Sequence, residues 1–238
     1  MSAVQWRYDL IKTIEMMMIA GNTPPTSTTR AICSRCQRPL TNCICRWATT
    51  IINQVEVLVL QHPLEVGNAK GSARLLDLCL QTSVMMVGEQ FEQQHLSDAL
   101  YAPSMMRSNA GALQPVLLYP DIGDNEASDL VIERAPALQE DLDPRTIRLV
   151  VLDATWRKSR KMLYLNPLLQ SLPRLSLSAM PASHYRIRKA HKPDQLSSLE
   201  ASTYALMRLE QNEAKYWPLI DAFDGFVEQQ MQWMPPRS

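Results

Sequence analysis

The segment RLVVLDATWRKSRKM, residues 148–162, predicts a buried β-strand that leads directly into a helix. Its first part, RLVVLD, is a short apolar run rich in valine and leucine, which is typical of a strand covered on both faces. Asp153 ends this run, and Thr155 stands where it can cap a helix expected over about 157–169. A buried strand that leads into a helix is the repeating unit of α/β proteins.

The same alternation continues on both sides of this segment. Further strand candidates are VEVLVL, SVMMV, PVLLYP and LPRLSL, at 55–60, 83–87, 115–120 and 172–177. Helical patterns occur at 69–80 and 124–134, and the tail reads as two helices over 197–232, broken near 216–218. We therefore predict an α/β fold with a mostly parallel sheet and helices on both faces. Ligands bind beyond the carboxyl ends of such strands, so we expect functional residues at 62–65, 119–121 and 153–156.

Four of the five cysteines follow the spacing C-x2-C-x6-C-x-C, at Cys33, Cys36, Cys43 and Cys45. Nothing in the sequence points to secretion, and in a reducing compartment clustered cysteines bind metals more often than they form disulfides. Four thiolates without a histidine suit tetrahedral zinc in a closed structural site. An iron–sulfur cluster also takes four cysteines, and a redox C-x-x-C pair is a third interpretation. Cys79, in the apolar run LLDLCL, is interpreted as a core residue.

The cysteines divide the sequence into three parts. We interpret residues 1–30 as an N-terminal extension and linker, 31–50 as a small zinc module, and 51–238 as the main domain. No apolar run approaches the ~20 residues that a membrane-spanning helix requires. We therefore expect a cytoplasmic protein with no membrane partner, and no obligate protein partner is evident.

The formal net charge is zero, but the charges are segregated along the chain. Residues 154–193 contain nine Lys or Arg and no acid, whereas 121–143 contain eight acids and one Arg. Such separation creates a local positive field, which suits a phosphate backbone. The alternative is a solvated helix face followed by a basic loop. The cations predicted to contact RNA are Arg157, Lys158, Arg160, Lys161, Arg186, Arg188 and Lys192.

Asp153 is the strongest candidate for chemistry. An acid at the end of a buried strand, followed at once by cations, fits a site for a polyanionic substrate that loses a proton. The alternative is an acid satisfied by the amides of the following helix. Trp156 suits the wall of a cofactor pocket or a platform for a base, and burial in the core is the alternative.

Asp153–Trp156 reads D-A-T-W, which resembles the D-x-T-W signature of the DTW-domain proteins. Other segments match that family's elements in the same order. His62–Glu65 resembles its H-P-x-E element, with GSARLL downstream at 71–76, and Leu118–Pro120 resembles its strand-end turn. LSSLEA at 196–201 resembles L-S-T-x-E-A, with serine in place of threonine. The four-cysteine leader is similar to that of bacterial members, and the likeness extends from about 33 to 233.

By this resemblance the chain is similar to tRNA-uridine aminocarboxypropyltransferases. These enzymes transfer the 3-amino-3-carboxypropyl group of S-adenosylmethionine (SAM) to N3 of a tRNA uridine and release methylthioadenosine. The resemblance implies a fold related to the SPOUT methyltransferases, with a C-terminal trefoil knot, which is a rare exception to the usual rules of chain topology. It also implies SAM and tRNA as ligands.

In that setting Asp153 is expected to be the general base for the N3 proton, or to orient the substrate or the cofactor. The strand-end loops are expected to hold the cofactor, chiefly through backbone groups. Ser197 and Glu200 also read as a capping box, which alone accounts for them. The residues expected at the cofactor are Leu118, Tyr119, Pro120, Thr155, Trp156, Pro173, Leu175, Ser197, Ser198, Leu199, Glu200 and Ala201.

Two other functions fit the same residues. The first is a SAM-dependent RNA methyltransferase on the same fold, which differs in the carbon of the sulfonium that is attacked. The second is a non-catalytic, zinc-containing RNA-binding module. The segments shared with the DTW-domain proteins favour the aminocarboxypropyltransferase.

Overall fold

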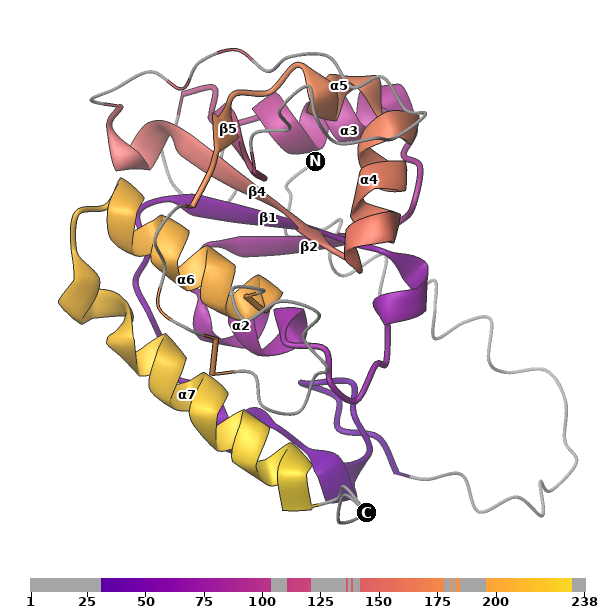
Figure 1. The fold of residues 1–238 in the computed structure, drawn as a ribbon, viewed down its shortest axis with the longest axis vertical. Coiled ribbons are helices and arrows are strands. Elements are labelled where there is room, and N and C mark those ends of the chain that lie inside the picture. The colour runs from indigo at the N-terminus through magenta and orange to yellow at the C-terminus, as the bar shows by residue number, and fades with distance from the viewer. Residues whose placement is uncertain are drawn as a thin grey trace, which may run out of the picture.

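The computed structural model describes residues 31–103, 111–120, 136, 138, 142–177, 181, 183–184 and 196–232. In this part of the chain, five strands form one sheet in the order β2-β1-β4-β3-β5, and every neighbouring pair is parallel (Figure 1). The two longest strands, β1 and β4, lie next to each other inside the sheet, with β4 in the middle. The strands are β1 (Glu56–Gln61), β2 (Ser83–Val87), β3 (Gln114–Leu118), β4 (Ile147–Asp153) and β5 (Arg174–Leu175).

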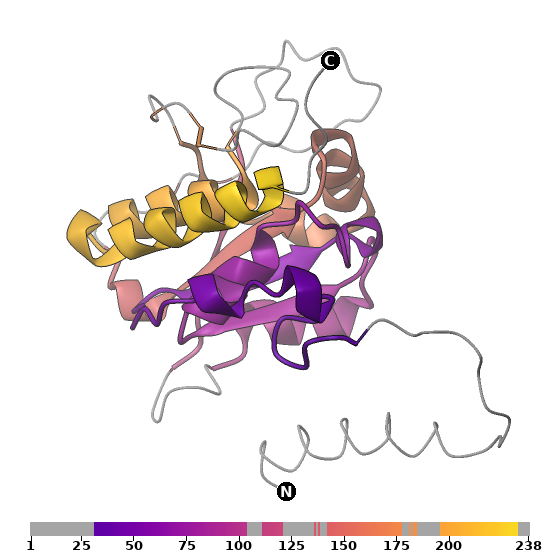
Figure 2. The same ribbon diagram turned by 90° about the horizontal axis from the view of Figure 1, so that it is seen from below.

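Helices cover both faces of the sheet, as Figures 1 and 2 show. One face carries α2 (Ala73–Cys79), α6 (Ser198–Leu209) and α7 (Glu213–Gln232), and the other carries α3 (Gln93–Tyr101), α4 (Trp156–Leu165) and α5 (Pro167–Gln170). Along β1, Val57 and Val59 pack into the first layer, and Leu58 and Leu60 into the second. Both faces of the strand are thus buried, which explains its uninterrupted apolar sequence. The predicted α/β fold with a parallel sheet is confirmed.

The strands lie close to their predicted positions, and the helices differ more. The single helix expected over about 157–169 is two helices, because Asn166 precedes Pro167 and proline disfavours a helical residue before it. Helix α3 was not predicted. Its signal is the acid Glu92, whose side chain accepts hydrogen bonds from the amides of Gln94 and His95 and caps the helix. The helix predicted at 124–134 lies outside the described residues.

The predicted break of the C-terminal helices near 216–218 is wrong. The chain turns at Gln211, whose φ is 48°, and the amide of Asn212 bonds the carbonyl of Met207 at 3.2 Å, as in a Schellman motif. The side chain of Asn212 then accepts from the amide of Lys215 and caps α7. Pro218 lies inside α7, where it removes one backbone bond near the start of a twenty-residue helix.

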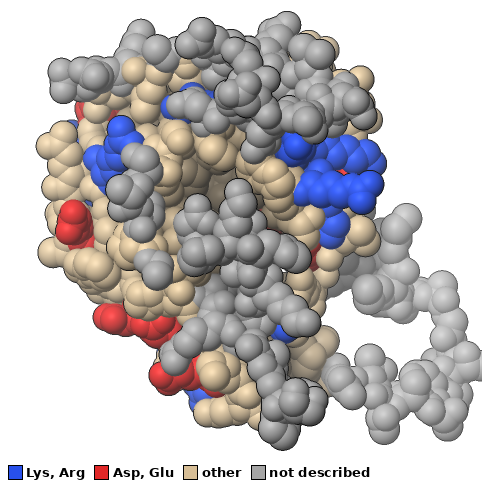
Figure 3. Space-filling view, viewed as in Figure 1, with Lys and Arg blue, Asp and Glu red and all other residues tan. Residues whose placement is uncertain are grey.

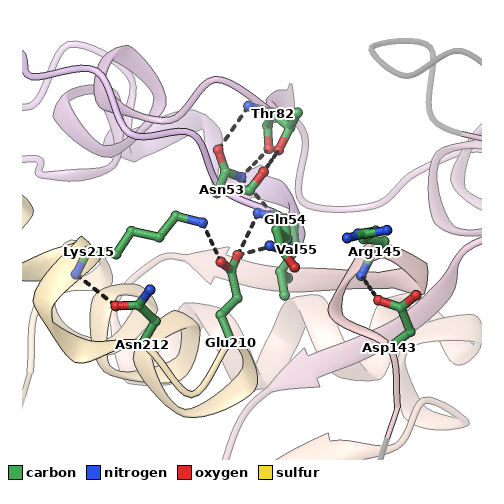
Figure 4. A network of polar contacts seen from close by, with 9 residues as sticks. All are labelled: Asn53, Gln54, Val55, Thr82, Asp143, Arg145, Glu210, Asn212 and Lys215. Atoms are coloured by element: carbon green, nitrogen blue, oxygen red, sulfur yellow. Dashed lines mark hydrogen bonds and ion pairs between the residues drawn. The ribbon is translucent and has the colours of Figure 1, made fainter.

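The turn between α6 and α7 is attached to the start of the sheet (Figure 4). The carboxylate of Glu210 accepts from the amides of Gln54 and Val55, at 2.6 and 2.9 Å, and from Nζ of Lys215 at 2.6 Å. Asn53 similarly joins the beginnings of β1 and β2 through Thr82. These contacts fix the position of α6 and α7 relative to the first residues of the strands.

The four-cysteine segment is part of the same core. Cys36 and Ile44 are buried in the layer built by α2 and α7. Short 3-10 helices occur at Leu40–Asn42 and Cys45–Trp47 in this segment, and at Pro63–Glu65 and Pro144–Thr146 in the strand connections. Among the described helices, none combines the length and the apolar character that crossing a membrane requires.

Candidate functional site

Asp153 lies at the carboxyl edge of the sheet and is 6% exposed. Its Oδ2 accepts a hydrogen bond from Nε2 of Gln61 at 2.8 Å, and its Oδ1 accepts from Oγ of Ser198 at 2.7 Å. Its backbone carbonyl accepts from the amide of His62 at 3.0 Å. The carboxylate therefore joins the ends of β1 and β4 to the first residue of α6. The two hydrogen bonds from Gln61 and Ser198 therefore fix the orientation of the carboxylate.

Thr155 and Trp156 follow Asp153 directly. Thr155 occupies the N-cap position of α4, as predicted, but its side chain makes no capping bond. Trp156 is 42% exposed, so the alternative that it is a core residue is wrong. Its ring stacks on Tyr119, with centroids 5.1 Å apart and planes 13° apart. Arg174 lies 5.8 Å from the centre of the Tyr119 ring.

The strand-end loops after β3 and β5 lie side by side. Leu118 pairs with Leu175, and the amide of Tyr119 bonds the carbonyl of Leu175 at 3.2 Å. Pro120 continues from Tyr119 and is exposed. Pro173 lies at the other end of β5, where it lines a cavity of about 430 Å³ together with Gln114. That cavity, and a second of about 410 Å³ beside α5, do not include Asp153.

The start of α6 meets this edge. Ser198 contacts Asp153, and the amide of Leu199 bonds Oγ of Ser72 at 3.3 Å. The capping box predicted from the sequence is confirmed, because Ser197 accepts from the amide of Glu200 and Glu200 accepts from the amide of Ser197. The Leu199 side chain is buried beneath this turn, and Ala201 is half-buried.

The carboxylate of Glu200 has a structural task. It is fully buried and also accepts from the Ser183 hydroxyl and from the amide of His184. Those bonds occupy the carboxylate, which leaves backbone groups of this turn, rather than the Glu200 side chain, as contacts for a cofactor.

His62 was noticed only as part of a motif, and the structure shows what it contacts. Its Nδ1 accepts from the amide of Leu64 at 3.1 Å, so the neutral ring carries its proton on Nε2. Nε2 lies 3.1 Å from Glu89, which also pairs with Lys161 at 2.9 Å. Lys161, and then His62, lower the pKa of Glu89.

Helix α4 carries four of the seven cations predicted to contact RNA, and Lys and Arg gather on this side of the molecule in Figure 3. Lys158 pairs with Glu65 at 3.0 Å and Lys161 with Glu89, so both charges are partly neutralised. Arg157 is exposed and forms no ion pair with the other described residues. Arg160 is half-buried, and Arg186, Arg188 and Lys192 lie outside the described part of the chain.

The four cysteines converge on one point. Every pair of Sγ atoms lies within 4.8 Å, with Cys33–Cys45 and Cys36–Cys43 both at 3.7 Å. These separations are too long for disulfides, and the thiols are free. Zn–S bonds of about 2.3 Å place tetrahedral ligands about 3.8 Å apart, so the donor set fits one zinc ion. An iron–sulfur cluster places several atoms between its cysteines and requires wider spacing. A closed set of four thiolates supplies structure and no open position for catalysis.

The four-cysteine loop, residues 33–47, is called the metal loop here because its thiols could hold a metal ion, and it braces helix α7. Nε1 of Trp47 donates to Gln229, and Nε2 of Gln229 donates to the carbonyl of Cys43 at 3.2 Å. Gly225 lies against the Trp47 ring so closely that a Cβ there would overlap it. Cys79 is buried nearby, as predicted.

A comparison with known protein families matches most of the chain. The model of the DTW domain matches residues 30–231. The chain belongs to the DTW domain family. Asp153–Trp156 of this DTW domain is the segment at the carboxyl edge of β4, and the H-P-x-E element and the capping box flank it in space.

Curated relatives of this DTW protein have a consistent name. The chain is 26% identical over 207 residues to tRNA-uridine aminocarboxypropyltransferase 2 of Macaca fascicularis, and 25% identical to that of Mus musculus. Each match covers 85% of this chain and 64% of the relative, so the chain spans just under two thirds of their length. It is 27% identical over 142 residues, or 56% of the chain and half of the relative, to tRNA-uridine aminocarboxypropyltransferase A of Arabidopsis thaliana. No solved structure matches the chain.

Three residues of this DTW site were missed from the sequence. Gln61 follows the strand predicted at 55–60 and is the last residue of β1, Ser72 lies in the GSARLL segment, and Glu89 follows β2. Gln61 and Glu89 are polar residues at the carboxyl ends of parallel strands, which is the signal that identifies them. Ser72 has no such signal, because only the packing of α2 against α6 gives it a partner.

Proposed function

We propose that this DTW protein is a tRNA-uridine aminocarboxypropyltransferase that uses SAM. Two observations taken together support the proposal. The family match covers most of the chain, and the D-x-T-W segment lies at the carboxyl edge of a parallel sheet, where such folds bind ligands. The relatives' names supply the reaction class. A SPOUT-type knot and a cytoplasmic location remain predictions that accompany it.

The reaction forms a bond between N3 of uridine and the terminal methylene carbon of the methionine arm. The bond from that carbon to the sulfonium breaks, and its electron pair stays on sulfur, so neutral methylthioadenosine leaves. N3 must lose its proton to become a nucleophile, and a carboxylate near it serves as the acceptor. Choice of this carbon over the methyl carbon is a matter of cofactor orientation.

Asp153 is the proposed acceptor. The hydrogen bonds from Gln61 and Ser198 hold its carboxylate in one orientation at the carboxyl edge of the sheet, as a positioned base requires. Each oxygen receives one of these two hydrogen bonds, so the plane of the carboxylate is fixed relative to the ends of β1 and β4. The same geometry suits a carboxylate that orients the cofactor amine, which is the alternative role.

The proposed cofactor contacts are the adjoining loops at 118–120 and 173–175, together with the start of α6. Adjacent β3 and β5 present the backbone of the first two, and Ser198 ties the third to Asp153. Trp156, which stacks on the buried ring of Tyr119, offers an exposed aromatic surface beside them, which suits a nucleobase. Pro173 lies at the opposite end of β5, away from the carboxyl edge of the sheet. We therefore propose that it shapes β5 and does not contact the cofactor.

The cations of α4 are the proposed contacts to tRNA phosphates. They lie on the element that begins directly after Asp153, so a bound RNA would place a nucleotide near the carboxylate. Zinc held by the four cysteines would stabilise the fold, and no chemical step is assigned to it.

The decisive experiment is incubation of the purified protein with SAM and unmodified tRNA, followed by mass spectrometry of the nucleosides. We expect a uridine that has gained an aminocarboxypropyl group, and methylthioadenosine in solution. A gain of one methyl group would establish the methyltransferase instead. No modification and no SAM binding in calorimetry would favour the RNA-binding module.

A further inference from the structure

Arg38 occupies the metal loop between the second and third cysteines, and its side chain is turned inward. It is 7% exposed. The guanidinium donates to the carbonyls of Ala69 and Gly71, both at 2.7 Å, and to that of Asn68 at 3.4 Å. It also lies 5.2 Å from the ring centre of Phe226 in α7. A guanidinium committed to three carbonyls is not offered to an RNA phosphate.

The loop that Arg38 contacts leads directly to the candidate site. Residues 68–71 run into Ser72, whose buried hydroxyl accepts from the amide of Leu199. The neighbouring Ser198 donates to Asp153. One continuous set of contacts therefore connects the metal loop with Asp153: Arg38, the loop at 68–71, Ser72, and the first turn of α6.

We propose that Arg38 is a positioning residue that couples metal occupancy of the four-cysteine loop to the start of α6 beside Asp153. Two short 3-10 helices are the only regular helices in the described residues 31–50, so the metal is expected to fix the position of that loop. Arg38 passes this constraint to the loop at 68–71, because charged hydrogen bonds to carbonyls are directional and strong. The coupling depends only on contacts within the fold, and the cofactor measurement alone rests on the proposed function.

Hydrogen exchange of the full-length protein tests the coupling without any ligand. The Leu199 amide is the reporter, since its partner is the Ser72 hydroxyl. Arg38→Met keeps the side-chain length approximately and removes all the donors. We expect exchange at Leu199 to become about tenfold faster or more, which corresponds to loss of one charged hydrogen bond. Zinc content, measured by a colorimetric chelator assay, should stay at one ion per chain.

Matched measurements separate coupling from a general loss of stability. Arg46 belongs to the same loop, is exposed, and places its guanidinium over the Trp47 ring. Arg46→Met removes this cation and should leave the exchange rate of the Leu199 amide unchanged. Removing zinc from the wild type with a chelator should accelerate exchange at Leu199 as Arg38→Met does. Because both act through one contact, chelation of Arg38→Met should add little at Leu199. Unchanged exchange in Arg38→Met, or fully additive effects of mutation and chelation, would overturn the proposal.

The cofactor measurement extends the test to function. Arg38→Met should raise the KM for SAM several-fold while the salt dependence of tRNA binding stays that of the wild type. Arg38→Lys, which keeps the charge and can reach one carbonyl, should restore part of the difference. A reduced salt slope without a change at Leu199 would instead make Arg38 a phosphate contact. If the wild type bound no SAM, the proposed function would fail while the exchange result still decided the coupling.

Discussion

At the scale of single residues, Asp153 concentrates the candidate chemistry. It is buried, it accepts hydrogen bonds from Gln61 and Ser198, and it ends β4, the middle strand of the sheet. Side chains so constrained are positioned to contact a ligand in one orientation. Its role is best measured by a change that keeps its shape and removes its charge.

Asp153→Asn should lower kcat by about 10²-fold or more, which is the usual contribution of a positioned acid or base. SAM affinity, measured by calorimetry, should change little, because the amide keeps the size of the carboxylate. Asp143→Asn, at an exposed helix cap remote from this edge of the sheet, is the matched control and should retain activity. Normal turnover in Asp153→Asn would remove the residue from the mechanism.

Glu89 gives a pH dependence whose sign follows from its partners. Lys161 and His62 lower its pKa in the folded protein, so the unfolded chain binds protons more readily. The stabilisation from Glu89 is present above the unfolded pKa of about 4.3 and is lost as pH falls through the folded pKa. Urea unfolding between pH 3 and 6 should show a smaller decline of stability in Glu89→Gln than in the wild type. Equal declines would show that Glu89 is not linked to folding.

At the scale of elements, α4 and α7 support separate predictions. Among the cations of α4, Arg157 is exposed and Lys158 is paired with Glu65. We expect Arg157→Ala to weaken tRNA binding and to lower the slope of log K against log salt by about 0.7–0.9, the value for one phosphate contact. Lys158→Ala should have a smaller effect, since its charge is already partly compensated. Filter binding across a salt series measures both slopes, and equal slopes would count against the distinction.

The contact of α7 with the metal loop depends on a glycine. A Cβ at Gly225 would overlap the Trp47 ring, so Gly225→Ala forces the helix and the loop apart despite the better helix propensity of alanine. Overpacking of this kind costs about 1–3 kcal/mol in unfolding free energy. Gly111→Ala, where nothing lies within 4 Å, is the control and should be close to neutral. Denaturant unfolding compares the two variants, and a neutral Gly225→Ala would mean that Trp47 moves freely.

At the scale of the whole molecule, the four-cysteine loop shares the core built by α2 and α7. Removing its metal should therefore lower the melting temperature of the entire chain rather than release a separate module. Thermal unfolding with and without a chelator measures this difference. Cys79→Ala should destabilise the core yet keep the full response to chelator, because Cys79 is not a member of the metal set. A chelator response lost in that variant would implicate Cys79 in the site.

Much of the architecture could be read from local sequence. Buried parallel strands are short apolar runs, so β1, β2 and β4 were found within a residue or so of their bounds. The capping box of α6 and the metal spacing are also local patterns, and both were predicted. The break between α6 and α7 was misplaced, because Pro218 is a visible signal whereas the positive φ of Gln211 is set by the packing of the turn.

The sequence by itself determined the strand-and-helix alternation, the four cysteines that could hold a metal, and the family, because each depends on residues near one another in the chain or on motifs in a fixed order. Only the tertiary structure decided that Gln61 and Ser198 hold Asp153, that Glu65 and Glu89 neutralise two predicted RNA-binding lysines, and that Arg38 reaches the loop before Ser72. These partners are 30 to 93 residues apart in the chain. Their meeting depends on strand order and helix packing, which no local pattern encodes.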